Sequence, residues 1–583
     1  MEQFMDTKEV LVIFKTHLDV GFTGYAKDII DNYLNEFIPN AIRVGYELKD
    51  TETPFIWTVG SWMIWKALKE DKTGTVEKAI KDGILNWHGL PFTTHTELLN
   101  ATLFNFGLDI SCELDKRFGR KTIAAKMTDV PGHTRGMIPL MKKRNIGFLH
   151  IGVNPATPVP PVPPLFRWKN GDDSVVVMYE DGYGCTKEFD DFVLCFAHTH
   201  DNNGPQSKDE IIEVYNRIQE RFPNYVIKAA TLNDVAERIE IIKDIPVVEQ
   251  EIGDTWIHGA ATDPQKLSRY RNILRFIEKN GIHDETLREN LLLVPEHTWG
   301  MDVKKFFRDD KHYTHLQMDE CTEERKTIEK SWAEQRDYVC AAEKILNIKP
   351  DYDTAEPEVN GFELKPVPEN IKFEISWQIF DNNDYKRYKK EYMRINDSTV
   401  GWALWDFTKI GLPDYNGNVY KAKPTAFFEN DGTKMIKLQF EKDAEEKYGL
   451  PYFYMIIDGE NLEIKWFNKK ASRLPQACWL KIKGYEENWE LNKMGEWIKP
   501  SEIIGSPLIS AVEKGVRNKD VIIEPVDSAL VAPYGRMLLH YNETNLINDL
   551  YFNLYNNIWN TNFPMWYSDD ALFRFKIKKR QIG

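Results

Sequence analysis

The sequence predicts three parts in succession: a distorted α/β barrel, a three-helix bundle and a C-terminal β-sandwich. Short β-branched runs alternate with helical patterns through residues 1–255, and three helical stretches fill residues 256–346. Strand-like runs separated by turn signals then occupy residues 347–583. Strand–helix alternation is typical of α/β proteins with a parallel sheet or barrel, whereas successive short strands are typical of a sandwich.

The first part opens with the apolar run Val10–Phe14, which predicts a strand, and the amphipathic segment Asp28–Leu48, which predicts a helix. A second helical stretch lies at Leu98–Phe118. The other strand candidates are Phe55–Val59, Ile84–Trp87, Ile123–Met127, Phe148–Val153, Val175–Tyr179, Phe192–Ala197 and Val226–Leu232. Six prolines in residues 155–164 predict a rigid loop, because proline lacks the N–H that a strand ladder needs.

The second and third parts are recognised by a change of periodicity. Gln265–Lys279, Glu285–Leu293 and Glu323–Leu346 have helical patterns and predict the bundle. The strand candidates of the sandwich are Phe373–Trp377, Met435–Phe440, Tyr452–Ile457, Leu462–Trp466, Trp479–Ile482 and Ala571–Ile577.

Composition limits the classes of partner. The 583 residues correspond to about three domains at roughly 100–200 residues each. Acidic residues outnumber basic ones by 90 to 75, so the formal net charge is −15 and argues against nucleic acid or an anionic membrane surface as a partner. We find no apolar run long enough to span a membrane, and the apolar stretch near the N-terminus is too short for a signal-peptide core. A homo-oligomer is compatible with the sequence.

The cysteines indicate a reducing compartment. The chain has six of them, and none forms a C-x-x-C pair; they are Cys112, Cys185, Cys195, Cys321, Cys340 and Cys478. We therefore expect free thiols in a cytoplasmic enzyme, not a disulfide framework or a thiolate zinc site.

Histidines and aspartates follow the ends of several predicted strands. Ten of the 13 histidines lie in the first 300 residues. The strand-end residues are His17 and Asp19, then Asp129 and His133, then His198, His200 and Asp201, and finally His258. Because parallel α/β folds gather their sites at the carboxyl ends of strands, we expect these side chains to share one face.

The spacing His17-x-Asp19 suits a metal ion, because residues i and i+2 of an extended segment point to the same side. Adding Asp129 and His258 gives two nitrogen and two carboxylate ligands. That set suits Zn²⁺, although the residues alone do not separate it from other divalent ions. Each residue also has a structural alternative, since a single buried histidine is usually just hydrogen-bonded and Asp129 before Val-Pro-Gly can be a turn residue.

Four motifs of the first two parts carry a resemblance to a known family. They are HLDVGF (17–22), FIWTVGSWMIW (55–65), TDVPGHT (128–134) and IHGAATD (257–263). In order and spacing they resemble glycoside hydrolase family 38, the zinc-dependent α-mannosidases, and in particular a shorter mannosidase-like branch of that group. The resemblance extends over roughly residues 9–345, and the three predicted parts match the family's domain order.

The resemblance implies roles for individual residues. His17, Asp19, Asp129 and His258 would bind zinc, Asp129 would also be the nucleophile, and Asp201 would be the acid/base. Three residues depart from the family pattern: Phe22 stands where the family has a tryptophan, His200 where it has the first of two aspartates, and Gly259 where it usually has an acidic residue. These departures bear on the identity of the sugar more than on the class of reaction.

The implied reaction is a retaining displacement on an oligosaccharide or glycoside, with the second carboxyl group acting as acid and then as base. Glu180 and Asp181 are the next candidates for the acid. The predicted substrate-binding residues are Phe22, Trp87, His88, His133, Tyr179 and Trp299, and Tyr183 is a further aromatic candidate. The string EHTWG (296–300) places His297 and Trp299 in the bundle beside the barrel, where they can contact substrate.

Two other functions remain open at this point. A metal-dependent carbohydrate deacetylase also uses strand-end His and Asp ligands, but it activates a water molecule in place of a carboxylate nucleophile. A carbohydrate-binding protein without catalysis would keep the scaffold and lack the acid. Substitution of Asp129 separates these functions, because only a glycosidase needs it as a nucleophile.

Overall fold

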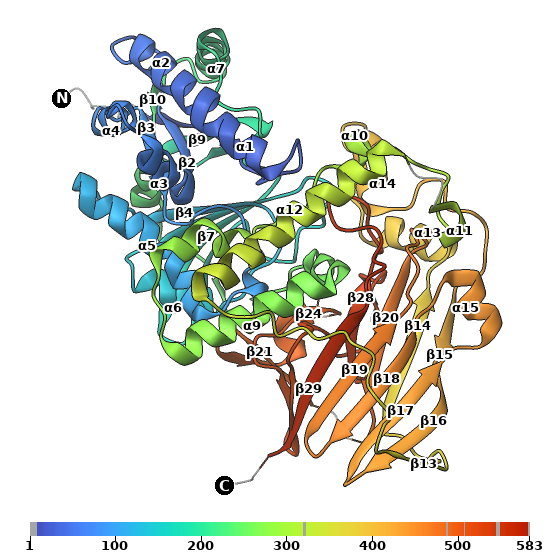
Figure 1. The fold of residues 1–583 in the computed structure, drawn as a ribbon. Coiled ribbons are helices and arrows are strands. Elements are labelled where there is room, and N and C mark those ends of the chain that lie inside the picture. Colours follow the sequence, from blue (N-terminus) through green and yellow to red (C-terminus); the bar gives the residue numbers. More distant parts are fainter. Residues whose placement is uncertain (1–7, 319–321, 485–487, 507, 544–547, 581–583) are drawn as a thin grey trace.

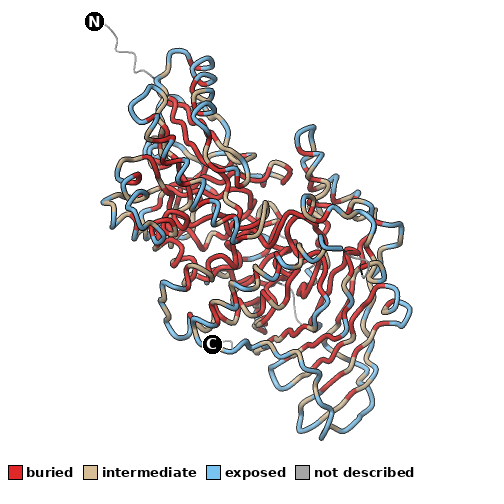
Figure 2. The backbone as a smooth tube through the Cα atoms, turned by 45° about the horizontal axis from the view of Figure 1, so that its top comes forward, coloured by how far each residue is buried: buried red, intermediate tan, exposed pale blue. Residues whose placement is uncertain are grey.

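The computed structural model describes residues 8–318, 322–484, 488–506, 508–543 and 548–580. Figure 1 shows an α/β part at the N-terminus and a part rich in long strands at the C-terminus, with helices α9 (Pro264–Asn280) and α12 (Glu323–Leu346) crossing between them. One cluster of buried apolar side chains includes residues of all three parts, and Figure 2 shows buried residues along the backbone of each part. No helix in the described ranges is long and apolar enough to cross a bilayer.

The strands of the N-terminal part form two sheets. The first has the order β3-β2-β1-β9-β8, with β10 also paired to β1. Its strands are β1 (Glu9–His17), β2 (Trp57–Gly60), β3 (Leu85–His88), β8 (Thr186–Glu188), β9 (Phe192–Asp201) and β10 (Val226–Ala229). The second has the order β11-β6-β7-β5-β4 and consists of β4 (Ala124–Asp129), β5 (Phe148–Val153), β6 (Leu165–Asn170), β7 (Asp173–Asp181) and β11 (Val247–Val248).

These sheets confirm the mixed α/β class but not a single closed barrel. Their edges meet where Gly89 N donates a hydrogen bond to Ala124 O at 2.9 Å, beyond the last residue of β3. β1 pairs in parallel with β2, β9 and β10 and is almost entirely buried, as expected for a strand covered on both faces. Parallel pairing brings the carboxyl ends of β1 and β9 to one edge, where His17 lies opposite Asp201.

The two helical stretches predicted in this part are present: residues 28–48 as α1 (Ala26–Asn32) and α2 (Ile38–Leu48), and residues 98–118 as α5 (Ala101–Phe118). The other helices are α3 (Ser61–Glu70), α4 (Thr75–Lys81), α6 (Met137–Lys142), α7 (Lys208–Arg221) and α8 (Leu232–Glu240). A π-helical turn at Tyr33–Phe37 joins α1 to α2 within the segment predicted as one helix. Strand β10 ends at Ala229, because Thr231 caps α8 with a capping box and starts a helix inside the predicted strand.

The middle part has two long helices rather than three. α9 and α12 match the prediction, but Glu285–Leu293 forms two short 3₁₀ segments, η4 (Glu285–Glu289) and η5 (Leu291–Leu293). Two contacts of Arg288 account for the difference. Its carbonyl accepts a hydrogen bond from Trp62 Nε1 at 3.1 Å, and its guanidinium pairs with Glu113 at 2.7 Å. These tertiary contacts take the place of a regular α-helical turn. The remaining helices of this region are α10 (Val303–Phe306) and α11 (His315–Met318).

The C-terminal part contains two mainly antiparallel sheets. The larger has the order β13 (Glu363–Lys365), β16 (Lys423–Asn430), β17 (Thr433–Gln439), β18 (Tyr452–Asp458), β19 (Asn461–Phe467), β29 (Ala571–Lys579), β26 (Val521–Pro525), β25 (Val516–Arg517), β21 (Glu490–Lys493) and β22 (Glu496–Ile498). The smaller has the order β15 (Asn418–Lys421), β14 (Phe373–Ile379), β20 (Gln476–Ile482), β28 (Tyr551–Asn556), β27 (Leu530–Ala532) and β24 (Ser510–Ala511). Their inner faces meet through aromatic rings, with Trp466 of β19 lying 5.7 Å from Trp377 of β14 and 5.8 Å from Tyr555 of β28.

Helices interrupt this β-rich part, contrary to a prediction of strands alone. They are α13 (Asn382–Glu391), α14 (Val400–Phe407) and α15 (Lys442–Tyr448). A capping box at Asp381 starts α13 directly after β14. Residues 380–417 thus leave the smaller sheet at the end of β14 and return to it as the neighbouring strand β15.

Contacts between distant segments hold the first and last parts together. β12 (Glu251–Ile252) pairs in parallel with β23 (Ile503–Ile504). The ammonium group of Lys493 is fully buried and lies 2.8 Å from Glu97 and 3.4 Å from Glu251. The boundaries near residues 255 and 346 stay a prediction. The five described cysteines are free thiols, and Cys321 lies outside the described residues.

Candidate metal-centred active site

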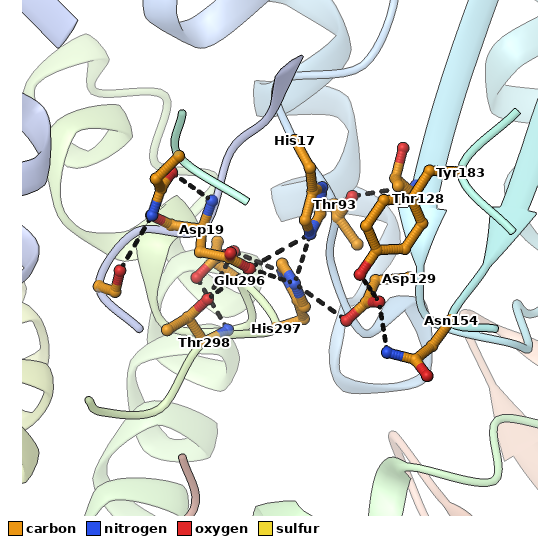
Figure 3. Close-up of polar contacts among 12 residues, drawn as sticks. His17, Asp19, Thr93, Thr128, Asp129, Asn154, Tyr183, Glu296, His297 and Thr298 are labelled. Atoms are coloured by element: carbon orange, nitrogen blue, oxygen red, sulfur yellow. Dashed lines mark hydrogen bonds and ion pairs between the residues drawn. The ribbon is translucent and has the colours of Figure 1, made fainter. Parts of the chain in front are cut away.

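Three polar side chains converge at the carboxyl end of β1. His17 Nε2 lies 3.2 Å from Asp19 Oδ1 and 3.2 Å from His297 Nε2, and His297 Nε2 lies 2.9 Å from Asp19 Oδ1 (Figure 3). All three residues are buried. The same group of atoms is the one cluster among the described residues whose geometry could hold a metal ion.

The distances fit the edges of a small coordination polyhedron. Zinc binds imidazole and carboxylate at about 2.0–2.2 Å, so two tetrahedral ligand atoms lie roughly 3.3 Å apart. The donor set of two imidazoles and a carboxylate also suits a divalent cation. The other oxygen of Asp19, Oδ2, is buried and lacks a hydrogen-bond partner among the described residues. Asp129 Oδ2 lies 3.6 Å from His297 Nε2, beside the three-residue cluster and outside it.

The segment that carries His297 is fixed on three sides. Thr94 Oγ1 donates to Pro295 O at 2.7 Å, and Phe22 N donates to Gly300 O at 3.1 Å. Trp299 N donates to Asn562 Oδ1, from the C-terminal part, at 2.8 Å. The loop after η5 therefore bridges the β1 edge and the C-terminal part.

Neighbouring groups set the ionisation of Asp19 and His297. Burial opposes the charged form of Asp19, but His17 and His297 hold the pKa of its carboxyl below the usual range. Burial also opposes a charge on His297, yet Glu296 and Asp19 raise its pKa well above the usual value. Glu296 Oε1 lies 2.6 Å from His297 Nδ1, on the far side of the ring, so it can fix the orientation of the imidazole.

Asp129, the last residue of β4, has a strained backbone and a held side chain. Its φ is +82°, which is rare for a residue with a side chain and typical of functional positions. Tyr183 Oη donates to Asp129 Oδ1 at 2.5 Å, and Asn154 Nδ2 donates to the same oxygen at 3.1 Å (Figure 3). The motif around Asp129 needs glycine at position 132, because a Cβ there would lie 2.1 Å from Gly253 O.

Asp201 is the last residue of β9 and lies opposite His17 of β1. The flanking residues His200 and Asn202 both have positive φ, at 65° and 51°. The Asn202 side chain accepts from Asp19 N at 3.0 Å and donates to Asp19 O at 2.9 Å, so it ties the two strand ends together. Burial and then the charge of Asp19 raise the pKa of Asp201 to about 7, and its Oδ1 has no hydrogen-bond partner in the described part of the chain.

A cavity of about 610 Å³ opens over these residues. Its volume is in the usual range for a small-molecule site. Its lining includes Asp19, Asp129, Asp201 and His297. Segments of the middle and C-terminal parts also contribute to the lining, among them Asp302, Lys304, Trp402, Asp406, Phe407 and Asn562.

His258 does not join the cluster, although the sequence placed it there. Its ring lies 4.4 Å from the Trp559 ring in an edge-to-face contact, and its carbonyl accepts from Asn556 Nδ2 at 2.8 Å. His297 occupies the place in the cluster that was predicted for His258. Next to His258, a Cβ on Gly259 would lie 2.2 Å from Phe563 Cζ, so an acidic side chain does not fit there.

The predicted substrate-binding residues divide in two. Phe22 lines the cavity, but the other five do not. Trp87 packs against Phe118, and Tyr179 donates to Pro131 O at 2.5 Å. Lys266 Nζ lies 3.7 Å from the centre of the Trp299 ring. His88 borders a separate small cavity beneath the site, and His133 is fully buried near Thr96. All five are buried positions outside the cavity lining.

The two alternative acids are engaged elsewhere. Glu180 lies 2.8 Å from His150 Nε2. Burial opposes ionisation of Glu180, but the contact with His150 lowers its pKa below the usual value. Asp181 is exposed and pairs with Arg394. Neither residue lines the cavity.

The sequence analysis did not place His297 in this cluster, although the string EHTWG singles it out as a candidate for substrate contact. A glutamate directly before a histidine was the available signal, since a carboxylate commonly orients a metal-binding imidazole. Lys304, Trp402 and Asp406 had no comparable signal, because they reach the cavity from helices far along the chain.

Comparisons with known proteins bear on the fold. A domain of unknown function, DUF5054, matches residues 260–372. An α-mannosidase from Enterococcus faecalis V583 aligns with a TM-score of 0.58 and 10% identity, covering 98% of this chain and 87% of that one. A protein in glycosyl hydrolase family 38 from Enterococcus faecalis aligns with a TM-score of 0.56 and 9% identity, covering 99% and 86%. No curated protein matches the sequence. The chain therefore has the fold of these two structures along almost its whole length.

Proposed function

We propose that this protein is a metal-dependent retaining glycoside hydrolase of the α-mannosidase type. The observation that carries the proposal is the convergence of His17, Asp19 and His297 beside Asp129, next to a cavity lined by Asp19, Asp129 and His297, in a chain with a mannosidase-like fold. We further propose Zn²⁺ as the ion, since two imidazoles and carboxylate oxygen suit it. The predicted division at residues 255 and 346 is part of the same proposal.

Four residues would hold the ion: His17, Asp19, His297 and Asp129. When bound, a divalent cation supplies a positive charge that polarises and orients sugar hydroxyl groups. Glu296 would hold the His297 ring in place from its Nδ1 side.

Asp129 is the proposed nucleophile. One of its oxygens attacks the anomeric carbon while the bond from that carbon to the leaving oxygen breaks. Tyr183 and Asn154 donate to Oδ1, so they hold the carboxylate in one orientation and stabilise its charge. A carboxylate held in this way is poised for attack and loses little freedom on reaching the transition state.

Asp201 is the proposed acid/base. A pKa raised by burial leaves a large protonated fraction near neutral pH, as a general acid requires. It gives its proton to the leaving oxygen and then removes one from the water that releases the sugar from Asp129. A bound cation would lower this pKa, because positive charge favours the carboxylate.

The test is hydrolysis of a panel of aryl α- and β-glycosides, including the α-mannoside, with and without a chelator. Asp129→Asn is assayed beside the unaltered protein. We expect one glycoside to be cleaved, and we expect both the chelator and the substitution to abolish cleavage. Cleavage by Asp129→Asn at the unaltered rate would overturn the role of Asp129.

The other two functions considered from the sequence are outcomes of the same test. Release of acetate from an acetylated sugar by Asp129→Asn, with no glycoside cleaved by either protein, would favour a deacetylase. Binding of sugar with no turnover of any substrate would favour a binding protein.

A further inference from the structure

Helix α14 (Val400–Phe407) brings a second set of side chains to the candidate site. It belongs to residues 380–417, which leave the smaller C-terminal sheet after β14 and return as the adjacent strand β15. In Figure 1 it lies beside α10, at the end of the molecule where the middle and C-terminal parts meet. Nothing in the chemistry proposed above uses this helix.

Two side chains of α14 face the cavity together. Trp402 and Asp406 are four residues apart, so they lie on one face of the helix, and both line the cavity. The Trp402 ring is oriented by its Nε1, which donates to Ser398 O at 3.2 Å, and it remains partly exposed. Trp405, on the same helix, lies outside the cavity lining, where the Arg308 guanidinium is 5.5 Å from its ring.

Asp406 is held firmly while keeping free acceptor positions. Lys304 Nζ lies 3.0 Å from its Oδ1 and 3.2 Å from its Oδ2, and Asn560 N donates to its backbone carbonyl at 3.0 Å. Each carboxylate oxygen has two lone pairs, so one hydrogen bond leaves capacity for another. Burial raises the pKa of Asp406 to about 7, so near neutral pH it can accept or donate a hydrogen bond. Hydroxyl groups, which do both, match that behaviour.

Phe22 is less suited to be the aromatic platform of this site. The Lys304 ammonium group lies 4.8 Å from the centre of its ring, so a cation already covers one face. Trp402 offers a larger ring, and no cation lies over it among the described residues.

We infer that α14 forms the sugar-recognising wall of the cavity, with Trp402 stacking on the apolar face of a pyranose ring and Asp406 hydrogen-bonding its hydroxyl groups. The inference rests on the proposed function for the statement that this sugar is the one cleaved. The ligand class is an uncharged sugar. Five carboxyl groups line the cavity against Lys304, His297 and the proposed divalent ion, so no net positive charge is left to attract a uronic acid or a sugar phosphate.

The test measures binding and turnover separately. Binding of methyl α-mannoside and the corresponding glucoside and galactoside is measured by calorimetry on the metal-loaded full chain, and kcat and KM are measured with the aryl glycosides. We expect Trp402→Ala to weaken binding of the preferred sugar about 10-fold and to raise KM to a similar extent. Trp402→Phe should recover most of the loss, because it restores an aromatic face.

Trp405→Ala is the matched control, since it removes a tryptophan from the same helix outside the cavity. Its binding and kinetics should equal those of the unaltered chain. Asp406→Asn should weaken binding about 10-fold, because the amide replaces one acceptor by a donor. The metal content and melting temperature of each variant verify that the fold is retained. If Trp402→Ala does not fold, the binding of Trp402→Phe is compared with that of the unaltered chain instead.

The outcomes separate this inference from the proposed hydrolysis. If a glycoside is cleaved and Trp402→Ala behaves like Trp405→Ala, the α14 inference is overturned while the hydrolase survives. If no glycoside is cleaved but an uncharged sugar binds and Trp402→Ala weakens that binding, the inference about α14 is supported and the proposed hydrolase activity is refuted. Tighter binding of a methyl glucuronide or mannose 6-phosphate than of every uncharged sugar would overturn the ligand class.

Discussion

The Nε2 atoms of His17 and His297 lie 3.2 Å apart although the residues are 280 positions apart in the chain. Two imidazole nitrogens at this distance both point to one location, and Asp19 Oδ1 lies within 3.2 Å of each. Without a cation, one of the rings must carry a proton between them. With a cation, both nitrogens and the carboxylate become ligands and the proton is released, so metal affinity should rise with pH.

The first prediction concerns which late histidine binds the ion. We expect the purified chain to hold about one divalent ion, His297→Gln to lose it, and His258→Gln to keep it. Zinc affinity depends on the number of ligands that face the ion, and only His297 faces the other two. The measurement is the metal-to-protein ratio by mass spectrometry after dialysis.

His258→Gln is also the control for burial, because both histidines are almost inaccessible. Loss of metal from His258→Gln with retention in His297→Gln would refute a site built on His17, Asp19 and His297.

The second prediction concerns the leaving group. Asp201→Asn should reduce kcat/KM about 10²–10⁴-fold for a glycoside with a poor leaving group. The loss should be much smaller for an activated aryl glycoside, whose oxygen leaves without a proton. The acid must be protonated, so activity should fall as the pH rises through the pKa of Asp201, and Asp201→Asn should lack this alkaline limb.

Asp181→Asn is the matched control for the second prediction, since Asp181 is an exposed carboxylate outside the cavity. An equal loss for good and poor leaving groups in Asp201→Asn would remove Asp201 from the role of acid.

The third prediction concerns acid stability. Burial lowers the pKa of His133 to about 4, below its usual value, so the folded chain holds this ring neutral. The unfolded chain binds a proton that the folded chain does not, so the stabilising contribution is present above pH 6.5 and is lost as the pH falls from 6.5 to 4. His133 contributes up to about 3 kcal/mol to this pH dependence.

Thermal unfolding of His133→Gln and of the unaltered chain between pH 7 and pH 4 measures the effect. The melting temperature of His133→Gln should fall less steeply across this range. His283→Gln, which alters an exposed histidine, should keep the original slope. Parallel curves for all three proteins would contradict a buried neutral His133.

The fourth prediction concerns the motif around His258. Gly259→Ala should destabilise the fold by about 2 kcal/mol, because the new methyl group would overlap the Phe563 ring. Gly147→Ala is the control, since nothing lies within 4 Å of a Cβ at that position. Denaturant titration gives the free energy of unfolding of each variant. Equal stability of Gly259→Ala and Gly147→Ala would show that the Phe563 contact is not tight.

Local periodicity was sufficient to predict the elements with a strong apolar pattern. Strands such as Phe148–Val153 and helices such as α12 match their predicted bounds because the pattern of apolar residues reports burial directly. The prediction of a helix at residues 285–293 was wrong, because contacts of Arg288 with Trp62 and Glu113 determine the conformation of this segment. Helix propensity depends on the local sequence and does not take such tertiary contacts into account.

The site was predictable where its residues end strands. His17, Asp129 and Asp201 are each the final residue of a strand, and parallel pairing fixes where strand ends lie. His297 comes from a loop whose position depends on bonds to residues 94, 22 and 562, so no local pattern predicts where it lies. His258 lies outside the cluster, since a motif gives the order of residues along the chain and not their path in space.

The route of the chain through the site has a consequence for biosynthesis. His17 and Asp19 leave the ribosome first, and at about 5–20 residues per second roughly 15–60 seconds pass before His297 follows. Trp402 and Asn562 come later still. A nascent chain that stops before His297 therefore presents two of the proposed ligands without the third. On the proposed site, a captured ion would exchange freely until His297 has been added, and ion release from such shorter products would distinguish them from longer ones.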